Sequence, residues 1–187
     1  VVEEVFTYAV SDGTLTSSAE LRFTVTGLND RPIATSNRDV VLENETIESD
    51  TDKSLLLDDV DVDGDTLAVS AVRSGAIDGV GSNGALGESL VGLYGSLILN
   101  SDGSYRYTAN AAEFLASGEE VEDVFSYTVS DGTLNSSAEI RITITGVNDV
   151  PVAIGDIDTV AENSEITSVI DKSLLSNDED IDGDVLS

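Results

Sequence analysis

The stretch Ala138-Glu139-Ile140-Arg141-Ile142-Thr143-Ile144-Thr145 alternates apolar with polar residues over its whole length. Successive side chains of a β-strand point to opposite faces of a sheet, so this stretch predicts a strand with Ala138, Ile140, Ile142 and Ile144 on one face. Val124–Val129 alternates in the same way. Asp131-Gly132 lies between the two stretches and predicts a hairpin turn, because glycine adopts positive φ without strain.

Strand signals continue on the N-terminal side of this hairpin. Further strands are predicted at Ser96–Leu99 and Ser104–Thr108, which flank Asp102-Gly103, and at Asp39–Leu42, Ser54–Leu57 and Thr66–Arg73. One short helix is predicted at Ala111–Ser117, with Asn110 as its N-cap and Glu113 as the capping-box partner. The glycine-rich Ser74–Glu88 predicts a long loop. Many short strands without a βαβ rhythm predict an all-β fold, an immunoglobulin-like or cadherin-like Greek-key β-sandwich.

The sequence also repeats itself. Val121–Leu134 resembles Val2–Leu15, an offset of 119 residues, and the same offset relates Asp180–Asp184 to Asp61–Asp65. We interpret residues 31–149 as one complete repeat, residues 1–30 as the C-terminal part of a preceding repeat, and residues 150–187 as the N-terminal part of a following one. We expect the two partial repeats to be poorly ordered or completed by a neighbouring chain.

The charge of the chain limits its partners. It has 37 acidic and 8 basic residues, a formal net charge of −29, and a hydrophobic fraction of 40% that is sufficient for a core. Nucleic acid and anionic membrane surfaces need Lys and Arg, so neither is an expected partner. No apolar run reaches the length of a membrane span, so membrane insertion is not expected. Residues 1–10 contain two glutamates and no basic start, so we expect any export signal to lie outside them.

The available metal ligands are all oxygen atoms. Cys, His, Met and Trp are absent, which removes disulfides and the usual ligands of zinc, copper and haem. Carboxylate and carbonyl oxygens are the ligands that hard cations prefer, calcium above all. The sequence therefore predicts calcium, with several ions per repeat.

The richest carboxylate cluster comprises Asp59, Asp61, Asp63 and Asp65, and it recurs as Asp178, Asp180, Asp182 and Asp184. Like charges at this spacing repel one another, and a divalent cation replaces the repulsion with coordination. The pattern resembles the first half of an EF-hand loop, but Ser70 replaces the bidentate glutamate and no helix flanks it. We predict a calcium loop completed by ligands from elsewhere. An ordinary solvated strand face is the alternative.

Three weaker candidates complete the predicted metal ligands. The junction Asn29-Asp30 before Pro32, repeated as Asn148-Asp149, fits either a linker turn whose Asp caps backbone amides or a calcium site between repeats. Glu43 interrupts an apolar run and recurs as Glu162, which favours a ligand role. Asp12 and Asp131 lie in Ser-Asp-Gly turns and are predicted either as ligands or as ordinary turn formers.

These motifs resemble known families. Tyr94–Tyr107, Val124–Gly132 and Ile142–Asp149 are similar to the VCBS repeat, and Asp61–Leu67 resembles the related bacterial cadherin-like repeats. The resemblance implies a β-sandwich strung in tandem within a giant secreted bacterial protein, such as an RTX adhesin or a biofilm matrix protein. It implies an extender role at the bacterial cell surface, with calcium at the domain junctions. It places ligands at Asp61, Asp63 and Asp65, and at Asp30 and Asp149.

We therefore predict a calcium-stabilised extender repeat whose partners are neighbouring repeats of the same chain, with neighbouring chains as a second option. We also predict that the chain is not an enzyme, because nucleophilic triads lack His and Cys, and because the carboxylate clusters recur with the repeat. Two alternatives stay open. The chain could be a carbohydrate- or surface-binding module, for which Tyr94, Tyr105, Tyr107 and Tyr127 could form a platform. It could also be the subunit of a self-assembling extracellular filament.

Overall fold

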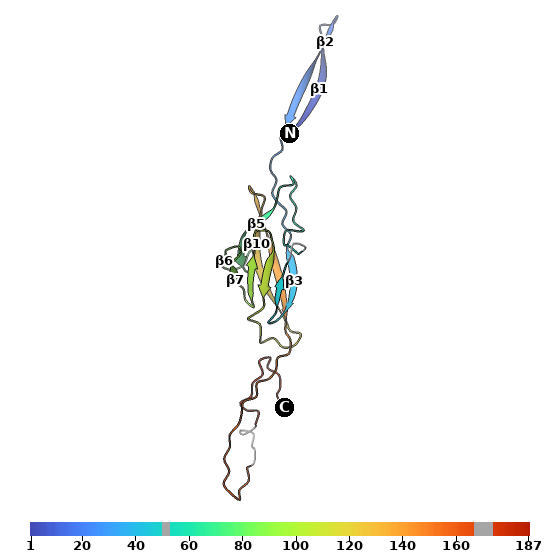
Figure 1. The fold of residues 1–187 in the computed structure, drawn as a ribbon. Coiled ribbons are helices and arrows are strands. Elements are labelled where there is room, and N and C mark those ends of the chain that lie inside the picture. The colour runs from blue at the N-terminus through green and yellow to red at the C-terminus, as the bar shows by residue number, and fades with distance from the viewer. Residues whose placement is uncertain (50–52, 167–173) are drawn as a thin grey trace. The chain divides into compact units, whose positions relative to one another are not determined.

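The fold is taken from a computed structural model, which describes residues 1–49, 53–166 and 174–187. The chain divides into two compact units, Val1–Asp30 and Arg31–Ser187. The first unit is a hairpin of β1 (Val2–Ser11) and β2 (Thr16–Val25), paired antiparallel (Figure 1). Its turn is closed by Asp12, whose carboxylate accepts hydrogen bonds from the N–H groups of Thr14 and Leu15.

The second unit contains two sheets. Its strands are β3 (Asn37–Leu42), β4 (Thr46–Glu48), β5 (Ala68–Ser74), β6 (Asn83–Gly84), β7 (Ser89–Val91), β8 (Ser96–Leu99), β9 (Tyr105–Thr108), β10 (Glu120–Ser130) and β11 (Asn135–Thr145). The larger sheet has the order β3-β11-β10-β5-β6, and the smaller one has the order β4-β9-β8-β7. All neighbours are antiparallel except β3 and β11, which run parallel. This parallel pair places the end of β3 beside the end of β11.

One hydrophobic core joins the two sheets. The predicted inward face of β11 is buried, since Ile140, Ile142 and Ile144 are each 0% exposed. From the smaller sheet, Tyr107 of β9 meets Phe125 of β10 edge to face, with ring centroids 6.1 Å apart. The Tyr107 hydroxyl donates to the buried carboxylate of Asp123, also on β10. Residues of both sheets thus share one interior, and the predicted all-β sandwich is confirmed.

The predicted helix at Ala111–Ser117 is wrong. The segment contains isolated turns, in which Leu115 N–H donates to Ala112 O and Glu119 N–H donates to Ala116 O. Both ends of the segment are hydrogen-bonded to other loops, because Ala111 N–H donates to Tyr94 O, between β7 and β8, and Gly118 N–H donates to Gly146 O, after β11. A stretch this short does not nucleate a helix against such tertiary contacts.

The predicted strand at Ser54–Leu57 is also wrong. These residues form a turn, in which Leu57 N–H donates to Ser54 O, while Leu55 N–H donates to Gly103 O. Leu55 is 1% exposed and fills the core between the sheets. The apolar residues of Ser54–Leu57 are therefore explained by the burial of Leu55 in the core, and not by a strand.

The other predicted strands are found with shifted ends, and Ser96–Leu99 is found as predicted. The Ser74–Glu88 loop contains the two-residue strand β6, and the guanidinium of Arg73 binds the carbonyls of Ala76, Ile77 and Gly79. No helix among the described residues has the length and apolar character that a membrane span needs.

Candidate metal centre

Glu43 lies immediately after β3, at the position where β3 and β11 end together. Its N–H donates to Thr145 O, which extends the ladder between the two strands. Asn44 follows in a left-handed conformation, with φ of 62°, and Glu45 N–H donates to Leu42 O. Asparagine tolerates this conformation better than most residues, so the chain can turn back here. The turn leaves Glu43 buried, at 1% exposed.

The carboxylate of Glu43 is only partly satisfied by protein groups. Oε1 accepts a hydrogen bond from the N–H of Val147, which lies in the junction after β11. Oε2 is buried and has no hydrogen-bond partner. Burying a carboxylate oxygen without a partner is costly, and buried charges in proteins are paired or coordinate metals. Glu43 is therefore the side chain that most directly indicates a cation.

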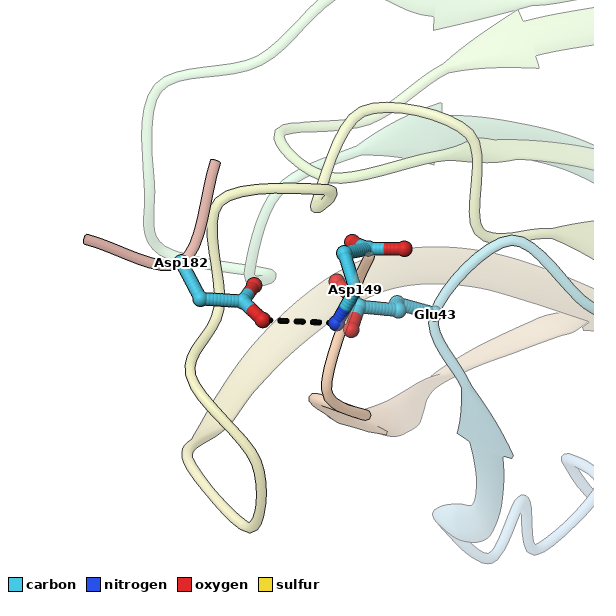
Figure 2. Close-up of side chains that lie close together, drawn as sticks. All are labelled: Glu43, Asp149 and Asp182. Atoms are coloured by element: carbon cyan, nitrogen blue, oxygen red, sulfur yellow. Dashed lines mark hydrogen bonds between the residues drawn. The ribbon is translucent and has the colours of Figure 1, made fainter. Parts of the chain in front are cut away.

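Asp149 and Asp182 approach Glu43 from two other segments. Figure 2 shows the three side chains together, with the dashed hydrogen bond from Asp149 N–H to Asp182 Oδ2, 2.7 Å long. One carboxylate oxygen from each residue lies within 4.8 Å of the others. Asp182 Oδ1 is also buried without a hydrogen-bond partner. Two unsatisfied carboxylate oxygens are thus found in one small cluster.

This arrangement suits a hard divalent cation. Calcium binds oxygen at about 2.3–2.6 Å, so two oxygens on one ion lie up to about 5 Å apart. Without a cation, two carboxylates at this separation repel by about 3 kcal/mol at an effective permittivity of about 20. Glu43, Asp149 and Asp182 therefore fit a calcium site, and their backbone-anchored positions explain why the side chains stay together.

A second group of carboxylates adjoins the first through a shared residue. Asp180, Asp182 and Asp184 also bring oxygens within 4.8 Å of one another. Asp180 Oδ1 accepts hydrogen bonds from the N–H groups of Asp182 and Asp184, each 3.1 Å long. Gly183 has φ of 79°, which closes this tight loop. Asp182 belongs to both groups, so it can link two neighbouring cations.

The cluster at Asp61–Asp65, which aligns with Asp180–Asp184, has the same local geometry. Asp61, Asp63 and Asp65 form the third close group, and Asp61 Oδ1 accepts from the N–H groups of Asp63 and Asp65. Gly64 takes the part of Gly183, with φ of 80°. Asp61 Oδ2 is buried without a partner, as is Asp59 Oδ2. The two loops, which are related by the offset of 119 residues, thus adopt the same backbone conformation.

The acidic residue that begins each cluster anchors the preceding chain. Asp59 Oδ1 accepts from Thr35 N–H, and Asp178 Oδ1 accepts from Ile154 N–H, both at 2.7 Å. Burial raises the pKa of Asp59, although the Thr35 N–H opposes this shift and the charge of Asp58 adds to it. Each contact lies next to an antiparallel bridge, of Ile33 with Val60 and of Val152 with Glu179.

The remaining predicted ligands lie elsewhere. Asp12 and Asp131 each cap a hairpin turn through one carboxylate oxygen, and hydrogen bonds from Leu15 and Thr14 lower the pKa of Asp12. Asn148 Nδ2 donates to Asp149 O, and Asn29 Nδ2 donates to Asp30 O in the first unit. Among the described residues, Asp12, Asp30, Asp131 and Glu162 fall in none of the three close carboxylate groups.

Sequence reasoning missed one acidic neighbour of the centre. Glu113, predicted as a helix-capping residue, lines a hollow of about 690 Å³ together with Asn44, Asp149 and Asp178. The duplicated aspartates gave no signal for Glu113, because it lies far from them in sequence and outside any repeated motif. Its position adds negative charge beside the cluster.

The tyrosines do not form a binding platform. Tyr105, Tyr107 and Tyr127 are 6%, 0% and 1% exposed, and Tyr94 is only partly exposed and packs against the same core. Burial raises the pKa of Tyr107, and its hydrogen bond to Asp123 raises it further. These rings are therefore core residues.

Comparison with known proteins gives a family and a set of distant folds. The family model described as "Bacterial cadherin-like domain" matches residues 29–146. Among curated proteins, no sequence matches the chain. Similar solved structures include the endo-fucoidan hydrolase MfFcnA4 from glycoside hydrolase family 107, with 23% identity and a TM-score of 0.37 over 78% of this chain and 19% of that one. They also include the endo-fucoidan hydrolase MfFcnA9, with 23% identity and a TM-score of 0.34 over 75% of this chain and 22% of that one.

The sequence-based prediction that the chain is not an enzyme is contradicted by these structures, which are hydrolases, and it is withdrawn. The absence of His and Cys was too weak a ground, since the hydrolysis of sugars needs only a pair of carboxylates. The chain spans about a fifth of the length of the hydrolase chains it matches. At these TM-scores the likeness assigns neither an activity nor a site to this chain.

Proposed function

Because the chain belongs to the bacterial cadherin-like domain family, we propose that it is a calcium-stabilised structural module of a secreted bacterial protein. A bacterial cadherin-like domain fits an extracellular structural or adhesion-type role. The proposed setting is a large adhesin or matrix protein at the cell surface, built from consecutive repeats of about 119 residues. In that setting the module acts as an extender, and its partners are the repeats on either side.

One observation carries the proposal: the carboxylate of Glu43 is buried with an unpartnered oxygen, next to Asp149 and Asp182. An apolar or neutral residue would be less costly at a position 1% exposed. A divalent cation removes the cost, because it provides the partner that both Glu43 Oε2 and Asp182 Oδ1 lack. The net charge of −29 adds a general repulsion that bound cations reduce.

The proposed role of the ion is mechanical. Glu43 follows β3 of the complete repeat, Asp149 lies in the junction after β11, and Asp182 belongs to residues 150–187. Calcium held by all three residues would join the body of the sandwich to the segment that follows the junction. Asp180 and Asp184 would hold a second ion, which shares Asp182 with the first.

Asp59, Asp61, Asp63 and Asp65 are the proposed equivalent at the other end of the complete repeat. They have the same turn geometry as Asp178–Asp184, but the aligned counterpart of Glu43 that would complete them would lie in a preceding repeat. Calcium would then be held both within the repeat and at each of its ends.

The expected stabilisation is large relative to the stability of one domain. Extracellular calcium modules bind with dissociation constants of about 10⁻⁴–10⁻³ M. At roughly one hundred times that constant, one site stabilises the folded state by about 2.7 kcal/mol. Two or three such sites approach the total stability of a typical domain, about 5–15 kcal/mol.

Thermal unfolding in calcium and in chelator tests the proposal. We expect the melting temperature of the second unit to fall by at least about 5 °C when calcium is replaced by chelator. Magnesium at the same concentration should restore less of the loss, because it requires a smaller octahedral site. Equal melting temperatures in calcium, magnesium and chelator would refute the proposed function.

A further inference from the structure

The hairpin of β1 and β2 has an exposed apolar face. The rings of Phe6 and Phe23 pack edge to face with centroids 5.7 Å apart, yet they remain 52% and 49% exposed. Tyr8, Leu21 and Val25 are about half exposed as well. A two-stranded hairpin is marginally stable alone in water, and a contiguous apolar patch marks an interaction surface.

The aligned face of the second unit shows what covers such a surface. Phe6 aligns with Phe125, and Phe23 aligns with Ile142, both of which are 0% exposed. In the sandwich, β8 and β9 cover this face, and Tyr107 packs against Phe125. The side chains that need a cover in the hairpin are thus of the same kind as those that have one in the sandwich.

The two outer edges of the hairpin indicate the same partner. In the larger sheet, β11 pairs with β3 and β10 pairs with β5. In the first unit, β1 and β2 form a two-stranded sheet by themselves. The free edge of β2 therefore corresponds to the edge that β3 occupies in the sandwich, and the free edge of β1 to the edge that β5 occupies.

We propose that the β1–β2 hairpin docks a second copy of the segment spanning residues 31–119, in the register that β10–β11 uses. In the same polypeptide this copy would come before the hairpin, as residues 31–119 come before β10. The proposal does not depend on calcium. The hairpin would then complete a further sandwich, packing through its apolar face and pairing along the outer edges of β1 and β2.

The register assigns new contacts to two hairpin residues. Tyr8 aligns with Tyr127, whose hydroxyl donates to Thr35 O and accepts a hydrogen bond from Asn37 Nδ2. Glu4 aligns with Asp123, which accepts from the hydroxyl of Tyr107. Glu4 and Tyr8 are exposed in the hairpin and become buried hydrogen-bonding groups on docking.

The test extends the chain at its N-terminus with a copy of residues 31–119 and measures amide hydrogen exchange in calcium and in chelator. We expect amide exchange in β1 and β2 to be at least about a hundredfold slower in the extended chain than in the original chain, when both are measured in calcium. Phe23→Asp should abolish this protection, because its side chain faces the added sheet. Thr24→Asp, which adds the same charge on the opposite face, should retain it.

Two results would overturn the proposal. One is equal exchange of β1 and β2 with and without the added segment, while β10 and β11 stay protected in both chains. The other is a concentration-dependent dimer of the unextended chain that protects β1 and β2, is abolished by Phe23→Asp, and persists after extension. That result would show the face of one hairpin packed on the face of another. A failure of calcium binding alone would leave the extension result unchanged.

Discussion

The N–H of Asp149 donates a 2.7 Å hydrogen bond to Oδ2 of Asp182, although 33 residues separate the two in sequence. The bond orients the Asp182 carboxylate toward Glu43, whose own N–H is bound to the end of β11. A hydrogen bond alone would not require three carboxylates to lie together. The arrangement is better explained as a cation site whose ligands are positioned by backbone hydrogen bonds.

Glu43→Gln should raise the dissociation constant for calcium by at least about tenfold, because it removes one negative ligand from the site. In chelator the same variant should be at least as stable as the parent chain, since Gln leaves no buried unpaired charge. Isothermal titration calorimetry and melting curves check the two halves of this prediction. Glu45→Gln, an exposed neighbour, is the control and should change neither. A loss of stability in chelator equal to that in calcium would identify a purely structural role for Glu43.

Asp182→Asn should weaken the binding of two calcium ions, whereas Asp184→Asn should weaken the binding of one. Asp182 belongs to both carboxylate groups at the junction, while Asp184 belongs to only one of them. Calorimetric titrations of the two variants measure this difference as the number of sites lost. Equal effects of the two substitutions would be inconsistent with a shared ligand.

Asp123→Ala should lower the free energy of unfolding by about 3 kcal/mol or more. The Asp123 carboxylate is buried and accepts hydrogen bonds from the N–H groups of Leu93 and Tyr94 and from the Tyr107 hydroxyl. Its removal leaves three donors without an acceptor, one of them the buried Tyr107 hydroxyl and the other two part-buried N–H groups. Glu122→Ala, on the opposite face of β10, breaks ion pairs with Arg38 and Arg141 and should cost no more than about 1 kcal/mol. Urea unfolding of both variants in calcium provides the measurement.

Glu139→Gln should reduce stability at neutral pH by about 1 kcal/mol and have less effect in acid. The N–H of Ile77 and the guanidinium of Arg141 lower the pKa of Glu139 in the folded state. A lowered pKa means that this contribution is present above the unfolded-state pKa and is lost as the pH falls through the folded-state value. Urea unfolding in chelator at pH 7 and pH 3 should show the difference shrinking, with Glu88→Gln as an exposed control. A difference that grows in acid would reverse the assigned sign.

The strands were predictable because their cause is local. Alternation in β11 and the Asp-Gly turn before it are direct consequences of strand geometry, and the buried face followed from them. Ala111–Ser117 and Ser54–Leu57 failed for a different reason. Hydrogen bonds to loop residues distant in sequence fix these segments as turns, and no local pattern encodes such contacts.

The candidate metal centre was predictable in its parts but not as a whole. Each repeated carboxylate motif was visible, because like charges at close spacing stand out in a sequence. The meeting of Glu43 with Asp149 depends on the parallel pairing of β3 with β11, which lie about one hundred residues apart. Sequence spacing alone carries no information about that pairing.

A crystal structure of the chain grown in calcium tests the central claim most directly. We expect an ion with oxygens of Glu43, Asp149 and Asp182 at about 2.3–2.6 Å, and anomalous scattering at its position. The same three carboxylates pointing away from one another into water, with no ion between them, would contradict the account.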